Sequence, residues 1–138
     1  MGYLLDTNVV SEPLRTSPNL NVVRWLQTTS PELQHLSVLS IAELRRRVET
    51  MPTGQRREKV RLFIEHHLPA WYGARLLPVT LGIADRWGRL AAELGRSLPR
   101  FDSLIAATAL RHDLRVVTRN VSDFQYPGLE VINPWEFE

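Results

Sequence analysis

Four acidic side chains, far apart in the sequence, follow apolar segments or begin helical ones. Asp6 follows the apolar stretch YLL, Glu43 lies in the first turn of a predicted helix, Asp102 begins another helix, and Asp123 follows the stretch RVVT. Carboxylates that share one site raise one another's pKa values unless a cation lies among them. Oxygen ligands without His or Cys favour Mg²⁺ or Mn²⁺ over zinc. Such an ion polarises a phosphoryl oxygen and activates water, so the chemistry indicated is phosphodiester hydrolysis.

Short strands that alternate with helices are expected to bring these acids together. Apolar runs predict five strands, at Tyr3–Asp6, Leu36–Leu39, Leu76–Val79, Arg115–Thr118 and Glu130–Ile132. The segments between them have helical spacing, so we predict one α/β domain over residues 1–138, with a central, mainly parallel sheet flanked by helices. Functional groups in such sheets gather beyond the carboxyl ends of the strands. We therefore expect the acids to lie at one edge of the sheet.

Each acid taken alone also has a purely structural explanation. Asp6 is compatible with an Asx turn, and Ser40 to Glu43 fits the S-x-x-E capping box of a helix N-terminus. Asp102 in a first helical turn is favoured by the helix macrodipole, and Asp123 is compatible with a loop turn. Helix capping, however, gives no reason for all four acids to share one edge.

The composition excludes several classes of protein. The chain has 138 residues, of which 43% are hydrophobic and 23% charged, which is typical of a globular domain. The absence of cysteine excludes disulfide bonds and thiolate metal sites. No apolar stretch approaches the roughly 18 residues of a membrane span, and no signal peptide is recognisable, so we expect a cytoplasmic protein without membrane contact. Of the 17 basic residues 16 are Arg, which suits a phosphate-bearing partner but also reflects a GC-rich genome.

Four segments resemble the PIN-domain nucleases in order and spacing: LLDTNVV, LSVLSIAEL, FDSLIAATAL and VVTRNVSDF. More narrowly, the opening DTNVVSEPLR and the closing INPW resemble the FitB branch of the VapC-type toxins of bacterial toxin–antitoxin pairs. The resemblance covers nearly the whole chain. It implies a Mg²⁺- or Mn²⁺-dependent endoribonuclease that acts on RNA, usually as a homodimer. It also implies inhibition by a VapB-type antitoxin, through which alone the toxin is associated with DNA.

The resemblance also assigns roles to individual residues. It makes Asp6, Glu43 and Asp102 metal ligands, Thr118 a hydroxyl near the site, and Asn8 a residue that orients the ligands. Many family members have an acid where this chain has Asn120, so we expect Asp123 to serve as the fourth catalytic and metal-binding acid, with Asn120 in support. Arg47 stands where the family often has a small residue, which makes the local packing uncertain.

A nuclease with an acidic site also needs basic side chains that attract the phosphates. The candidates that flank the motifs are Arg15, Arg45, Arg46, Arg100 and Arg119. The densest basic stretch, GQRREKVR at residues 54–61, is better explained as a solvated helix face with ion pairs.

Two other functions remain open from the sequence. A phosphatase of the haloacid-dehalogenase type begins with a similar motif, but Asn8 replaces its second aspartate and the only lysine, Lys59, lies in a polar helical stretch. A catalytically weak PIN-fold protein that binds RNA or an antitoxin is the second alternative, because Asn120 replaces an acid.

Overall fold

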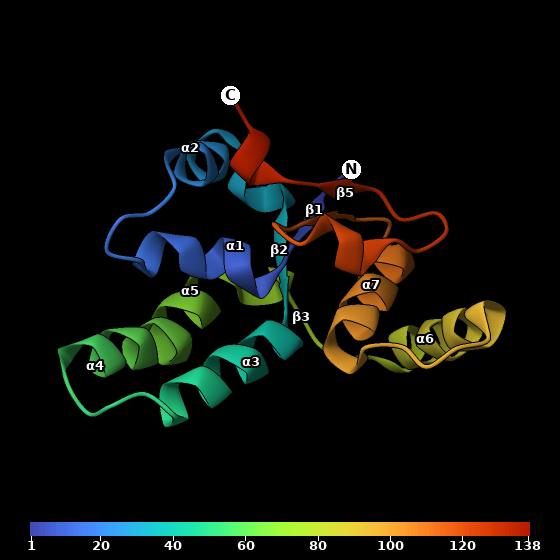
Figure 1. The fold of residues 1–138 in the computed structure, drawn as a ribbon, viewed down its shortest axis with the longest axis horizontal. Helices are drawn as coiled ribbons and strands as arrows, with labels where there is room; N and C mark the ends of the chain where they lie inside the picture. Colours follow the sequence, from blue (N-terminus) through green and yellow to red (C-terminus); the bar gives the residue numbers. More distant parts are fainter.

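The computed structural model describes all residues from 1 to 138, and a five-stranded sheet forms its centre (Figure 1). The strands are β1 (Tyr3–Leu5), β2 (Gln34–Ser37), β3 (Leu76–Leu77), β4 (Arg115–Val117) and β5 (Val131–Ile132). Their order is β3-β2-β1-β4-β5, and each neighbouring pair is parallel. In the central register Leu5 lies opposite Leu36 on one side and Val117 on the other. The predicted α/β fold with a parallel sheet is confirmed, and the strands end together at one edge.

The second strand lies two residues earlier in the chain than predicted. Leu39, expected in that strand, belongs to helix α3 (Val38–Glu49), whose N-terminus is capped by Ser37. The Ser37 hydroxyl accepts a hydrogen bond from the backbone N–H of Leu39 at 3.0 Å. Ser40 is therefore inside the helix, which excludes the alternative explanation of Ser40 to Glu43 as an S-x-x-E capping box. Glu43 consequently lies in the second turn of α3, not in the first.

Two apolar clusters hold helices against the two faces of the sheet. Leu4 and Leu5 are both fully buried but belong to different clusters, because successive side chains of a strand point to opposite faces. The Leu5 face is covered by α1 (Thr7–Ser11), α2 (Leu20–Thr28), α3, α4 (Gln55–Leu62) and α5 (Leu68–Tyr72). The Leu4 face is covered by α6 (Leu81–Leu94) and α7 (Arg100–His112), which lie together in Figure 1. Covering both faces explains why the strands are apolar runs without alternation.

The ends of α6 and its contact with α7 position the first turn of α7. The Thr80 hydroxyl caps α6 by accepting a hydrogen bond from the backbone N–H of Ile83, and Gly95, with a φ of 62°, ends it in the left-handed conformation. Within the pair, the Trp87 indole N–H donates to the Ser103 hydroxyl at 2.8 Å. This contact anchors the first turn of α7, which carries Asp102. None of the helices combines the length and the apolar composition that a membrane crossing requires.

Candidate active site

Asp6 is fixed at the carboxyl end of the central strand β1. Its backbone N–H donates to the carbonyl of Val117 at 2.9 Å, which continues the β1–β4 ladder. One carboxylate oxygen caps α1 by accepting the backbone N–H of Thr7 at 2.8 Å. The other accepts the Thr118 hydroxyl at 2.8 Å and the Asn8 amide at 3.3 Å. Asp6 can therefore cap α1 and also face the candidate site, and the residue is only 6% exposed.

The environment of Asp6 raises the pKa of its carboxyl in the free protein. Burial raises the pKa of the Asp6 carboxyl above its ordinary value, and the negative charge of Asp123 raises it further. The hydrogen bonds from Thr118 and from the backbone of Thr7 act in the opposite direction, but desolvation has the larger effect on the pKa. A cation close to Asp6 would reverse this balance, because it favours the ionised carboxylate.

Glu43 reaches the same region from α3 through a pair of buried hydroxyls. Thr7 Oγ1 lies 2.9 Å from Glu43 Oε1 and 2.9 Å from Ser40 Oγ. A hydroxyl has one hydrogen and an ionised carboxylate can only accept, so Thr7 donates to Glu43 and accepts from Ser40. Neither hydroxyl was expected at the site from the sequence, where Ser40 was considered only as a helix cap. Ser40 lies three residues before Glu43 on one helix face, which is the only signal in the sequence that pointed to it.

The pKa of Glu43 is also raised. Burial has the largest effect on the Glu43 pKa, and the charge of Asp6 adds to it, whereas the hydrogen bond from Thr7 lowers it. The positive charges of Arg47 and Arg46 lower the Glu43 pKa as well, so both guanidinium groups are near this carboxylate.

Asp102 shows that the four acids face a common space. It lies in the first turn of α7 and is partly buried. Burial raises the pKa of Asp102 to about 6, and the negative charges of Asp6, Asp123 and Glu43 contribute to the increase in that order. These three residues come from the end of β1, from the turn after β4 and from α3. The predicted convergence of the four carboxylates at one edge of the sheet is therefore seen in their electrostatic interaction.

The turn after β4 presents Asp123 near Asp6 and Asp102. Asp123 is exposed in the 3₁₀ turn η5 (Val121–Phe124), and its backbone N–H donates to the carbonyl of Asn120 at 3.0 Å. The backbone N–H of Asn120 in turn donates to Thr118 Oγ1 at 3.0 Å. Asn120 thus supports the hydroxyl that holds Asp6, and Asp123 supplies the negative charge that acts on the other acids.

The donor set fits a hard divalent cation, but the carboxylates do not form a closed ligand sphere. All four are oxygen donors without His or Cys, which suits Mg²⁺ or Mn²⁺. No group of three or more Asp, Glu or His side chains is gathered as tightly as a metal site requires. The acids are near enough to raise the pKa of Asp102 by mutual repulsion, which a cation would relieve.

The five arginine candidates differ in their surroundings. Arg45 forms an ion pair with Glu65 at 2.8 Å, and Arg15 forms one with the buried Glu12 at 3.3 Å. The guanidinium of Arg119 lies over the ring of Trp135, 5.2 Å from its centroid. The other two candidates, Arg46 and Arg100, are exposed and take part in no ion pair.

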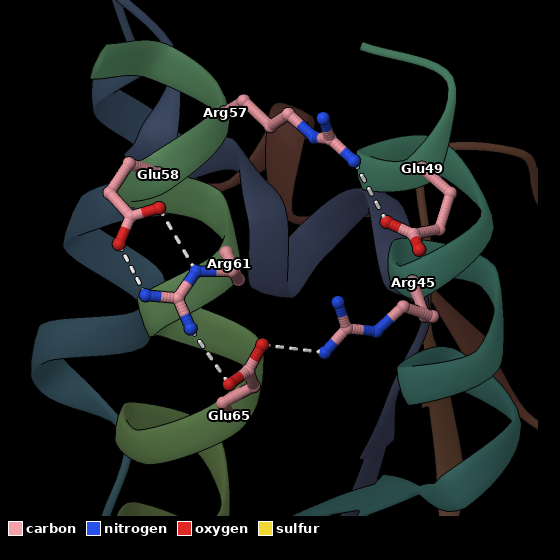
Figure 2. A network of polar contacts seen from close by, with 6 residues as sticks. All are labelled: Arg45, Glu49, Arg57, Glu58, Arg61 and Glu65. Carbon is pink, nitrogen blue, oxygen red and sulfur yellow. Dashed lines mark hydrogen bonds and ion pairs between the residues drawn. The ribbon is translucent and has the colours of Figure 1, made fainter. Parts of the chain in front are cut away.

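The basic stretch at residues 54–61 forms an ion-pair network, as predicted (Figure 2). Arg61 contacts Glu58 and Glu65 on its own side of the network, and Arg57 reaches Glu49 of α3 at 3.1 Å. Arg45 of α3 joins the network through Glu65, which lies in the π-helical turn η3 (Phe63–His67). These arginines are engaged by carboxylates, so they are poor candidates for phosphate contacts.

The largest hollow of the molecule lies apart from the acids. It has a volume of about 580 Å³ and is lined mainly by apolar side chains of α2, η3 and α5, together with His66 and His67. It contains none of the four carboxylates. The chemistry of the acids, and not the volume of a cavity, therefore identifies the candidate active site.

Comparison with known proteins identifies the family and the fold of the chain. Residues 3–125 match the family model described as PIN domain. The chain is 39% identical over 137 residues to the VapC ribonuclease Y4jK of Sinorhizobium fredii, covering 96% of this chain and 97% of that protein. It is 36% identical over 135 residues to Toxin FitB of Neisseria gonorrhoeae, covering 96% and 97%. A structure of FitAB bound to an IR36 DNA fragment matches with a TM-score of 0.87 and 34% identity, covering 99% of this chain and 97% of that chain.

Proposed function

Because the chain belongs to the PIN-domain family, among its VapC and FitB toxins, we propose that it is an endoribonuclease that requires Mg²⁺ or Mn²⁺. The observation that carries the proposal is that β1, α3, α7 and the turn after β4 bring four carboxylates to one edge of the sheet. There burial raises the pKa of Asp102 to about 6, with the charges of Asp6, Asp123 and Glu43 contributing to the increase. The name of the VapC ribonuclease relative supports RNA as the substrate.

The four acids have different tasks in the proposed reaction. Asp6, Glu43 and Asp102 would hold the ion, and Asp123 completes the acidic patch. When bound, a divalent ion supplies electrophilic assistance to phosphodiester hydrolysis. The Thr118 hydroxyl keeps Asp6 in one orientation, and the Ser40–Thr7 hydroxyl pair directs a hydrogen bond at Glu43. The carboxyl of Asp102 releases its proton near pH 6 in the free protein, so cations compete with protons for it below that pH.

Cleavage of a labelled RNA pool tests the proposed activity. The purified chain is assayed with Mg²⁺, with Mn²⁺ and with chelator, beside the variants Asp6→Asn and Asp85→Asn. Asp85 is the matched control, because it is exposed on α6 and pairs with Arg89 at 3.0 Å. We expect Asp6→Asn to lose about a hundredfold or more in rate, since metal assistance amounts to several kcal/mol. Undiminished cleavage by this variant, or in chelator, would contradict the assignment.

A protein antitoxin is the proposed partner. The structural neighbours include FitAB bound to a DNA fragment and a member of the VapBC family of toxin–antitoxin systems, which supports an antitoxin partner. We propose that this antitoxin inhibits the chain and that the chain is associated with DNA only through it. A homodimer that acts on RNA in the cytoplasm is part of the same proposal. Co-expression with the product of a small adjacent gene, followed by measurement of mass in solution and of RNA cleavage, tests these statements. A complex that still cleaves RNA at the rate of the free chain would exclude inhibition.

A second candidate function is a PIN-fold protein that binds RNA or antitoxin with little cleavage. Asn120 favours it, because its exposed side chain replaces an acid of the family motif. Calorimetry with Mn²⁺ separates the two functions. Binding that is lost in Asp6→Asn supports the nuclease, and the absence of binding supports the second function.

A further inference from the structure

A hollow of about 350 Å³ adjoins the acids on the side of α3. It is lined by Glu43, Arg46 and Arg47 from α3, by Thr50, which caps the C-terminus of that helix, and by Phe101 from the first turn of α7. These first four residues are spaced i, i+3, i+4 and i+7, so they lie along one side of α3 and its cap. Glu43 joins the hollow to the carboxylates, and Phe101 directly precedes Asp102. The volume lies within the range of roughly 300–1,000 Å³ that is typical of small-molecule sites.

Two of the lining residues carry positive charges without a partner. Arg46 and Arg47 are exposed, and their side chains make no ion pair and no hydrogen bond with another group, in contrast to the neighbouring Arg45. Both lower the pKa of Glu43, so they are close to the acid site. A guanidinium group binds a phosphate oxygen in a bidentate manner, and neither of these two groups is held in an ion pair, although both act on the charge of Glu43.

A second hollow, of about 370 Å³, extends this basic surface. It shares Arg47 with the first hollow and adds Arg56 and Arg15, of which Arg15 is paired with the buried Glu12. Arg56 donates to the backbone carbonyl of Leu14 at 2.6 Å and forms no ion pair with a carboxylate. Positive side chains therefore continue from the acid site across both hollows, as a phosphate backbone several nucleotides long requires.

Phe101 is the aromatic side chain of the first hollow. A base stacks on an aromatic ring largely independently of its identity, and only an unpaired base exposes the face needed for stacking. Accepting the function proposed above, we infer that this hollow is a subsite for one unpaired nucleotide of the RNA. Its base lies against Phe101, and its phosphate is bound by Arg46 and Arg47 beside the cleaved bond.

Binding of a labelled, mixed-sequence, single-stranded RNA to the full chain in chelator tests the subsite without cleavage. Fluorescence anisotropy is measured over a range of salt concentrations for the unaltered chain and for variants. We expect the double variant Arg46→Gln, Arg47→Gln to bind at least tenfold more weakly. Its log Kd should also depend less steeply on log salt, by about 0.7 for each phosphate that the variant no longer neutralises. Phe101→Leu should bind about five- to tenfold more weakly with an unchanged salt slope, and Phe101→Trp should restore binding.

Arg89→Gln is the control, since Arg89 is exposed on α6 and pairs only with Asp85. Circular dichroism and thermal midpoints establish that each variant is folded. Equal affinities of the unaltered chain, the double variant and Phe101→Leu would overturn the subsite, as would undetectable binding at micromolar protein or equally tight binding of duplex RNA. If these variants lose RNA binding and the unaltered chain shows no metal-dependent cleavage, the subsite is kept and the nuclease function is refuted. Failure of the subsite and failure of the proposed function are therefore distinguishable.

Discussion

The substitution Asp102→Asn is expected to stabilise the metal-free protein, although it removes an acid of the candidate active site. The pKa of Asp102 is raised from its ordinary value of 3.8 to about 6 in the folded protein. Between these two values the folded protein keeps a proton that the unfolded chain has released. The contribution of this carboxyl to stability is therefore full below pH 3.8, falls as the pH rises through about 6, and stays low at neutral pH.

The size of the effect follows from the same pKa difference. About 2.2 pKa units at about 1.36 kcal/mol per unit set an upper limit of about 3 kcal/mol. Asp102 is only partly buried, and solvent screening roughly halves this figure. The aspartate also gains about 0.5 kcal/mol from the macrodipole at the N-terminus of α7, which asparagine loses. We therefore expect a net increase of about 1 kcal/mol in the free energy of unfolding at pH 7.5.

Urea unfolding in chelator, at pH 7.5 and at pH 4.5, measures this difference. At pH 4.5 the folded protein already holds the proton, so the gain should shrink to a few tenths of a kcal/mol. The control Asp85→Asn removes an exposed carboxylate and should change stability by less than about 0.5 kcal/mol at either pH. An Asp102→Asn variant that is no more stable than the unaltered chain at pH 7.5 would refute the reasoning, and so would an equal gain at both pH values.

Three further predictions concern the same molecule. Saturating Mn²⁺ should raise the thermal midpoint of the unaltered chain and raise that of Asp102→Asn less, because the variant lacks a ligand; a thermal-shift titration measures both. Thr118→Val should lower the free energy of unfolding by about 1.5–3 kcal/mol at pH 7.5, since it removes the hydroxyl that donates to the buried Asp6, and urea unfolding measures the loss. Phe124→Ala should cost about 3–5 kcal/mol in the same assay, because the ring is buried under the turn that carries Asp123.

The strands were predictable because a parallel sheet covered on both faces leaves uninterrupted apolar runs. YLL in β1 and the two valines of β4 are such runs, and both strands begin where predicted. The run LSVL was misplaced because periodicity alone does not separate a short apolar strand from the start of a buried helix. The boundary is set there by the Ser37 cap, a local hydrogen bond that the apolar pattern does not reveal.

The convergence of the four acids was predictable because parallel strands end at the same edge of the sheet, and all four acids lie near that edge. The hydroxyls of Thr7 and Ser40 were missed because they meet across 33 residues of chain, through the packing of α1 on α3. The arginines could not be ranked for a related reason. Arg45 and Arg46 are neighbours in the sequence, but they point about 100° apart on a helix. One therefore reaches Glu65 and the other the hollow beside Glu43, which depends on the rotation of α3 against its neighbours.

The four carboxylates differ in how firmly the protein holds them. Asp6 accepts three hydrogen bonds and is buried, Glu43 accepts one from Thr7, and the side chains of Asp102 and Asp123 accept none. One acid is therefore preorganised, and the others are free to adjust toward an ion. Because only Asp6 is held firmly, the four acids do not form a closed ligand sphere, although the charges of the other three raise the pKa of Asp102.

A crystal structure of the chain with Mn²⁺ tests whether Asp6 stays fixed while the other acids adjust to the ion. We expect the side chains of Asp102 and Asp123 to rotate toward the ion while Asp6 keeps its hydrogen bonds to Thr118 and Thr7. An ion bound with Asp6 displaced from both partners would show that the hydroxyl network stabilises only the metal-free state. An ion bound with Asp6 in place would show that the edge of β1 defines the position of the metal, and that α7 and the turn after β4 supply ligands that adjust to it.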